Sequence, residues 1–241
     1  MKRNLPNAVT CLNLLCGCLA LTFVFSGEPH SLEHAAYFVG LAAVADFFDG
    51  LLARALRVSS AIGKDLDSLA DMVSFGVVPG AMLFKLLLAA LVGASAGPAG
   101  AKLLQYGPYV AFLLTVFSAL RLAKFNNDTR QTTSFIGLPT PACTLVVASL
   151  PLILAHDQFG LAPVILHPGL LLGLTLLLSG LLVAELPLFA LKFKNLRWAD
   201  NRRRFLFVLL AAGLLLALRA AAVPLIVLVY VLFSVPKTAA R

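Results

Sequence analysis

The segment ADFFDGLLARALRVSSAIGKDLDSLADMVSFG, Ala45 to Gly76, gathers acidic residues in a chain that has few of them. The sequence of 241 residues is 60% hydrophobic and 12% charged, and it contains 11 Asp and Glu in all. Five of these lie in the segment, namely Asp46, Asp49, Asp65, Asp67 and Asp71. A charged Asp inside an apolar helix costs several kcal/mol. Such placement indicates a chemical role.

The spacing of four of these residues predicts two carboxylate pairs. Asp46 and Asp49 are three residues apart near the end of one apolar run, and Asp67 and Asp71 are four apart at the start of the next. Each pair therefore shares a helix face. An antiparallel helix pair, joined by the turn around RVSSAIG, would point the four carboxylates at one another. Their mutual repulsion predicts a divalent cation, Mg²⁺ or Mn²⁺, with positions left open for substrate phosphates.

Helix capping is the alternative explanation of these acidic residues. It accounts well for Asp65, or for Asp67, at the start of a helix. It does not account for Asp46 and Asp49, because a negative charge is unfavourable near a helix C-terminus. We therefore expect Asp65 to cap a helix and the other four to act together.

Small residues accompany the carboxylates. Gly50 and Ala53 lie one to two turns along the first acidic face, and Gly63 precedes the second pair. Their lack of bulk lets a phosphate-bearing ligand approach the backbone closely. Arg54, beside them, can bind a phosphate through two hydrogen bonds.

The apolar runs predict an integral membrane protein. Mean hydropathy is +0.94, and several runs approach the roughly 20 residues that a helix needs to cross a bilayer. We expect an all-α polytopic helix bundle, one membrane domain over 1–241, with the catalytic signature at 46–71 and a C-terminal helix pair at 203–236. About eight transmembrane helices are predicted, at 8–26, 34–56, 66–93, 104–124, 138–157, 162–190, 204–218 and 220–236.

The positive charges predict the orientation. With the N-terminus inside, all of the 19 Lys and Arg fall at cytoplasmic ends except Lys85, Lys102 and Arg219, as the positive-inside rule requires. Both termini and the acidic cluster are then cytoplasmic. The net charge of +8 indicates anionic headgroups and substrates as partners. It does not indicate nucleic acid, because no soluble module remains to bind it.

The spacing of the acidic segment resembles the signature of the CDP-alcohol phosphatidyltransferases. The matching residues are Asp46, Asp49, Gly50, Ala53, Arg54, Gly63, Asp67 and Asp71. The resemblance implies that an alcohol displaces CMP from CDP-diacylglycerol at the cytoplasmic face of the inner membrane, in a homodimer. It also implies that the four aspartates hold two divalent ions, Mg²⁺ or Mn²⁺, with Asp71 as general base. Gly50, Ala53 and Gly63 would border the cytidine diphosphate.

Other segments bear on the acceptor alcohol. PNAVTCLNLLCGCLAL, DSLADMVSFGVVPG, SALRLAKFN and FIGLPTPA look most like the membrane-integral branch of the family that uses L-serine. Arg121 and Lys124 can hold the serine carboxylate or a lipid phosphate, although positive-inside anchoring explains them equally well. Arg130 is a further candidate, or else a solvated charge in a polar loop.

Several alternatives stay open at this point. Ser74 and Asn126 can bond substrate or, as is commoner in membrane helices, a neighbouring helix. The acceptor can also be glycerol 3-phosphate or an inositol phosphate. A divalent-cation carrier is a different class, but it predicts inverted repeats and a site at the bilayer midplane. The sequence shows no such repeat.

Overall fold

The structure is a computed structural model, and it describes residues 4–58, 60–94, 97–127, 134–189 and 198–234. Nearly all of these residues are helical. The α-helices are α1 (Leu5–Ser26), α2 (Ser31–Leu56), α3 (Ala61–Met72), α4 (Val78–Ala94), α5 (Gly97–Tyr106), α6 (Phe112–Asn127), α7 (Thr140–Ala155), α8 (Ala162–Ile165), α9 (Pro168–Val183), α10 (Trp198–Leu218) and α11 (Ala222–Ser234). Shorter elements are the π-helix η2 (Val73–Val77), the 3-10 helices η3 (Gly107–Ala111), η4 (Gln158–Gly160) and η5 (Arg219–Ala221), and the strands β1 (Ser134–Ile136) and β2 (Pro187–Phe189).

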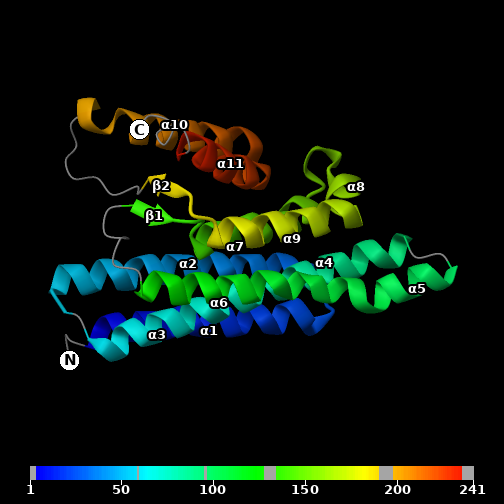
Figure 1. The fold of residues 1–241 in the computed structure, drawn as a ribbon, viewed down its shortest axis with the longest axis horizontal. Coiled ribbons are helices and arrows are strands. Elements are labelled where there is room, and N and C mark those ends of the chain that lie inside the picture. The colour runs from blue at the N-terminus through cyan, green and yellow to red at the C-terminus, as the bar shows by residue number, and fades with distance from the viewer. Residues whose placement is uncertain (1–3, 59, 95–96, 128–133, 190–197, 235–241) are drawn as a thin grey trace.

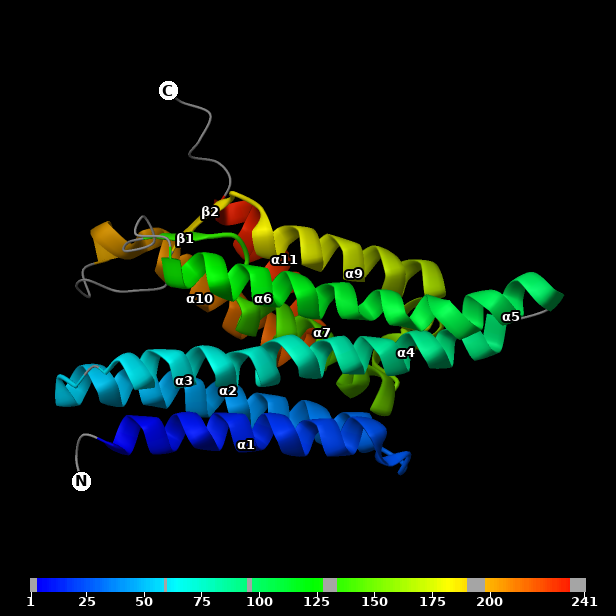
Figure 2. The ribbon, with the colours of Figure 1, turned by 60° about the horizontal axis from the view of Figure 1, so that its bottom comes forward.

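The long helices run back and forth along one axis (Figure 1). Helix α1 packs on α2 and α3, α2 packs on α7, and α6 packs on α9. The hairpin of α10 and α11 lies on the opposite side of the bundle from α1 (Figures 1 and 2). The start of α1, the end of α2 and the start of α3 meet at one end of the bundle, the end that also carries β1 and β2.

The turn between α2 and α3 has identifiable local causes. Arg57 ends α2 in the left-handed conformation, with φ of 52°, and its backbone N–H bonds back to Ala53 and Arg54. Ser60 then caps α3, because its Oγ accepts a hydrogen bond from the Gly63 N–H at 3.0 Å, as good N-cap residues do. The helix therefore begins at Ala61, earlier than predicted. The expectation that Asp65 caps it is wrong.

A π-turn interrupts the helix directly after Asp71. In η2 the Val78 N–H bonds to the Val73 carbonyl, five residues back. Such turns leave carbonyls without an ordinary helical partner and are frequent at functional sites. Neighbouring helices supply donors here: the Thr144 hydroxyl bonds to the Phe75 carbonyl at 2.9 Å. The Thr115 hydroxyl bonds to the Gly76 carbonyl at 3.0 Å.

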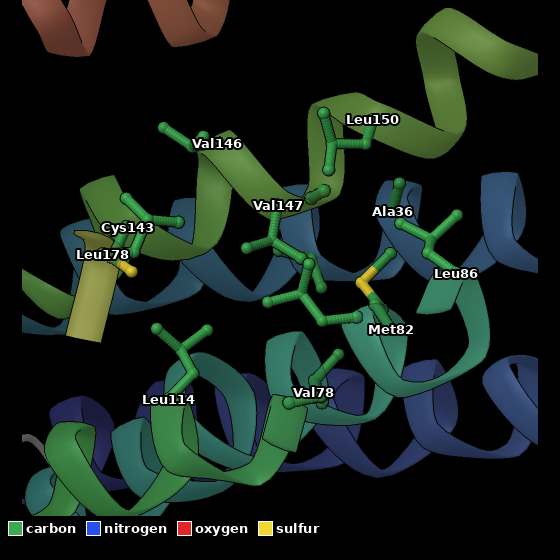
Figure 3. Close-up of a cluster of buried hydrophobic side chains, with 14 of the residues drawn as sticks. Ala36, Val78, Met82, Leu86, Leu114, Cys143, Val146, Val147, Leu150 and Leu178 are labelled. Carbon is green, nitrogen blue, oxygen red and sulfur yellow. The ribbon is translucent and has the colours of Figure 1, made fainter. Parts of the chain in front are cut away.

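The main core lies between α2, α4, α6, α7 and α9 (Figure 3). Val78 and Met82 of α4 are fully buried there. They face Val147 of α7, Leu114 of α6 and Ala36 of α2. This packing holds α4 in the centre of the bundle and so fixes α3, which carries two of the four aspartates.

The all-α membrane bundle is confirmed, whereas the count of eight spans is not. Among the described residues, five helical segments are long and apolar enough to cross a membrane: Leu5–Ser26, Ser31–Leu56, Ala61–Val92, Gly100–Asn127 and Arg204–Ser234. Helices α7 and α9 are apolar but have 16 residues each, about 24 Å against a bilayer core of about 30 Å. The last of the five segments is divided by η5, where α10 and α11 fold onto each other.

The predicted span 162–190 is wrong. The chain breaks between α8 and α9, where Pro168 opens a new helix, and it leaves α9 for β2. Strand β2 pairs antiparallel with β1, with Phe135 opposite Leu188. Strands of three residues are too short to show a periodicity of two, so neither strand was predictable from the sequence.

Candidate active site

The structure brings the four predicted aspartates together. Asp46 and Asp49 on α2 face Asp67 on α3, and one carboxylate oxygen of each lies within 4.8 Å of the others. Asp71, one turn after Asp67, contacts Asp46 through its carboxyl group. Asp49 is buried and the other three are half-buried. We call Asp46, Asp49, Asp67 and Asp71 the acidic cluster.

The acidic cluster is arranged to hold a divalent cation. Two like charges 4.8 Å apart repel by about 3 kcal/mol at an effective dielectric constant of about 20. No described residue forms a salt bridge with these carboxylates, so no direct ion pair in the described part of the chain relieves that repulsion. Asp46, Asp49 and Asp67 each offer one carboxylate oxygen to the site. Such a donor set fits a hard cation such as Mg²⁺ or Mn²⁺.

Helix α1 supplies partners for the cluster that the sequence analysis missed. The Thr10 hydroxyl donates a hydrogen bond to Asp49 Oδ2 at 2.6 Å. The Asn13 amide donates to Asp71 Oδ1 at 3.3 Å. Both residues are buried. The available signal was the spacing of Asn7, Thr10 and Asn13, three polar residues at intervals of three in an otherwise apolar span.

Replacing Thr10 by Val tests the support that α1 gives to Asp49. Partners that orient a metal-binding carboxylate change metal affinity or activity about 10- to 100-fold when removed. We expect Thr10→Val to raise the Mn²⁺ concentration for half-maximal activity by about tenfold or more. Thr22→Val is the matched control, because Thr22 is exposed and its hydroxyl bonds only to Leu19 of its own helix. Equal metal dependence in the two variants would contradict the assignment.

A cavity of about 260 Å³ adjoins the acidic cluster. Its lining contains all three predicted small residues, and it also contains two of the aspartates. The lining residues are Pro6, Asn7, Thr10, Asp49, Gly50, Ala53, Val58, Ser60, Gly63, Lys64 and Asp67. A Cβ on Gly63 would lie 3.0 Å from both Asn7 Oδ1 and Ser60 Oγ. A side chain at that position would therefore crowd two polar groups of the cavity lining.

The basic residues near the cavity are placed differently from one another. Lys64 lines the cavity, and its Nζ donates to the Asn126 carbonyl at the end of α6, 3.2 Å away. Arg54 is exposed one turn beyond Gly50 and does not line the cavity. Of these two, the sequence analysis predicted only Arg54.

The predicted acceptor-binding residues have three different outcomes. Arg121 is buried, with 7% of its surface exposed, and its guanidinium lies 4.9 Å from the centre of the Phe125 ring. It interacts electrostatically with Asp71 across the helix interface. Lys124 is exposed, and Arg130 lies outside the described residues. Because Arg121 is buried, it differs from an ordinary headgroup anchor, which would be exposed.

Ser74 and Asn126 bond to neighbouring helices, the commoner of the two alternatives. The Ser74 hydroxyl donates to the Asn13 carbonyl at 3.1 Å. The Asn126 amide donates to the Ser68 hydroxyl at 2.7 Å. These bonds tie α1 and α6 to the helix that carries Asp67 and Asp71.

Comparison with known proteins decides the family. The sequence model of the CDP-alcohol phosphatidyltransferases matches residues 3–189. The chain belongs to this family. The match includes the acidic cluster and the cavity of this phosphatidyltransferase, and it ends at β2, before α10 and α11.

Curated relatives carry one shared name. The CDP-diacylglycerol--serine O-phosphatidyltransferase of Bacillus subtilis is 33% identical over 163 residues, which cover 66% of this chain and 84% of the relative. The protein of that name from Helicobacter pylori (strain J99) is 28% identical over 232 residues, 95% of this chain and 89% of the relative. The one from Saccharomyces cerevisiae is 32% identical over 165 residues, which cover 62% of this chain and 55% of the relative. The similarity to the second of these extends over α10 and α11.

Proposed function

We propose that the protein transfers the phosphatidyl group of CDP-diacylglycerol to the hydroxyl of L-serine, forming phosphatidylserine and CMP. The observation that carries this proposal is the meeting of four aspartates beside a cavity lined by small residues. The serine acceptor is supported by the printed activity of the relatives. We place the site at the cytoplasmic face of the inner membrane, on the basis of the distribution of Lys and Arg.

The acidic cluster would hold two divalent ions, Mg²⁺ or Mn²⁺, through Asp46, Asp49, Asp67 and Asp71. When bound, such ions neutralise the diphosphate and help CMP to leave. Thr10 orients Asp49 through its 2.6 Å hydrogen bond. This contact holds Asp49 in position before substrate arrives.

The cavity would receive the nucleotide end of the donor. Gly50, Ala53 and Gly63 leave the backbone accessible, and Lys64 supplies a cation at the rim. Arg54, which is exposed, would meet a phosphate from outside the cavity. The acyl chains would remain among the apolar helix surfaces in the membrane.

Asp71 is the proposed general base. Its carboxylate would take the proton of the serine hydroxyl as the serine oxygen attacks the phosphatidyl phosphorus, while the bond from phosphorus to the CMP oxygen breaks. The Asn13 amide N–H donates a hydrogen bond to Oδ1 of this carboxylate. Arg121, buried near Asp71, would bind the acceptor. Lys124 and Arg130 would contribute positive charge near the same end of α6. A homodimer remains a prediction from the family resemblance.

The proposed function is tested with purified protein in detergent, by measuring CMP release from CDP-diacylglycerol with Mn²⁺ or Mg²⁺. L-serine, glycerol 3-phosphate and myo-inositol 1-phosphate are supplied separately. We expect metal-dependent release with serine and none above background with the other two. Release with a phosphorylated alcohol only would keep the chemistry and overturn the acceptor. Divalent-cation uptake into liposomes without any CMP release would instead favour a carrier.

A further inference from the structure

A few described polar atoms are buried without a hydrogen-bond partner, and two of them have complementary chemistry. The unpartnered atoms are Asn13 Oδ1, Ser118 Oγ, Arg121 Nε, Thr140 Oγ1 and Ser179 Oγ. The complementary two belong to Asn13 and Arg121. Asn13 is completely buried, and Arg121 is 7% exposed. Buried polar groups without partners are costly, so each needs an explanation such as an absent ligand. An amide oxygen accepts hydrogen bonds and a guanidinium donates them.

Both groups lie on helices that pack against α3, the helix that carries Asp71. The Asn13 amide nitrogen lies 3.3 Å from Asp71 Oδ1, which places the unpartnered Oδ1 of the same amide beside this carboxylate. Arg121 lies on α6, which packs on α3, and its positive charge acts on Asp71. Ser118, one turn before Arg121 on α6, packs close to Gly76 just beyond Asp71. A ligand whose hydroxyl reaches Asp71 would thus meet an acceptor and a cationic donor.

We propose that these two atoms recognise the two charged groups of an amino-acid acceptor. Asn13 Oδ1 accepts hydrogen bonds from its ammonium, and Arg121 binds its carboxylate. The proposal rests on the proposed function and deepens it, because it states how serine is distinguished from alcohols that lack either charge. Asn13 is then a specificity-determining residue in addition to its contact with Asp71.

The charge inventory favours a zwitterion over a phosphorylated alcohol. Within the described ranges, Arg121 is the one cationic side chain that is buried. A phosphate carries up to two negative charges and several acceptor oxygens, which call for more than one cation. One guanidinium beside one neutral acceptor matches a single carboxylate beside a single ammonium.

The experiment removes one charge from the ligand and one group from the protein in turn. Phosphatidylserine formation is measured by mass spectrometry, with 3-hydroxypropanoate (serine without its ammonium) and ethanolamine (serine without its carboxylate) as competitive inhibitors. The variants are Asn13→Leu and Arg121→Gln. The controls are Asn127→Leu, which changes an exposed amide that bonds within α6, and Lys102→Gln, which changes an exposed cation on α5.

The two variants are expected to give opposite patterns. Loss of a hydrogen bond to a charged group weakens binding by about tenfold or more. Asn13→Leu should raise the KM for serine and the inhibition constant of ethanolamine by this factor and leave 3-hydroxypropanoate unchanged. Arg121→Gln should weaken the binding of serine and 3-hydroxypropanoate and leave the binding of ethanolamine unchanged. The controls should behave as the wild type.

A third variant separates recognition from the positioning of Asp71. Asn13→Asp keeps an oxygen for the ammonium but loses the N–H that bonds to Asp71, so we expect a lower kcat with ethanolamine affinity retained. If Asn13→Leu weakens all three ligands equally, Asn13 only positions Asp71 and the inference is overturned. If the wild-type protein itself forms no phosphatidylserine, the proposed function is overturned together with this inference. Kinetic values are compared only for variants that elute like the wild type in gel filtration and unfold at a similar temperature.

Discussion

The Asp71→Asn variant is expected to lose about a thousandfold in kcat for CMP release. A positioned general base contributes about 10²- to 10⁴-fold to a reaction rate, and an amide cannot accept the proton of the acceptor hydroxyl. The substitution is nearly isosteric, and Asp71 is half-buried against Asn13 and Asp46. The loss should therefore come from chemistry and not from packing.

Asp65→Asn is the matched control for this variant. Asp65 is on the same helix, α3, but it is exposed and outside the acidic cluster. We expect it to retain wild-type kcat within about twofold. The KM for CDP-diacylglycerol should change less than kcat in Asp71→Asn, because the donor cavity lies along Asp49 and Asp67. If Asp71→Asn keeps more than a tenth of the wild-type rate, Asp71 is not the base.

The second large effect is expected from removal of divalent cations. Chelation should abolish CMP release, and Mn²⁺ or Mg²⁺ should restore it. The same ions should raise the melting temperature of the protein, because they bind the folded state and relieve repulsion among carboxylates that lie within 4.8 Å. Differential scanning fluorimetry in detergent measures this shift without any substrate.

Asp46→Asn should change the melting temperature relative to the wild type in opposite directions in chelator and in Mn²⁺. In chelator, loss of one negative charge removes about 3 kcal/mol of repulsion per close pair at most. We therefore expect a rise in melting temperature of several degrees, at about 2–4 °C per kcal/mol. In saturating Mn²⁺ the variant should melt below the wild type, since it has lost a ligand. Asp65→Asn should show neither change, and full activity in chelator would contradict the cation site altogether.

Much of the site was predictable because it depends on local spacing. Residues three or four apart share a helix face whatever the rest of the fold does, so the pairing of Asp46 with Asp49 and of Asp67 with Asp71 followed from the sequence. The short connection between α2 and α3 then made the meeting of the two pairs nearly unavoidable. Gly63 could be predicted for the same reason, as it lies one turn before Asp67.

Contacts made across the bundle were not predictable in this way. The bond from Thr10 to Asp49 joins residues 39 positions apart, and that from Asn13 to Asp71 joins residues 58 apart. No periodicity encodes such pairs. The burial of Arg121 was also hidden, because a basic residue at the end of an apolar run is usually a headgroup anchor. The two-stranded pairing of β1 with β2 was missed because each strand has only three residues.

The π-turn η2 has a further consequence for the geometry of the whole segment. In an uninterrupted α-helix, Asp67, Asp71, Val78 and Met82 would line up on one stripe, at 3.6 residues per turn. The extra residue in η2 shifts the phase of the helix by about 100°. One continuous helical rod can therefore aim carboxylates at α2 on one side of the shift and apolar side chains at α7 on the other. If Val73–Val77 were regular α-helix with no residue removed, the uniform stripe would return, and chemistry and core would then compete for the same face.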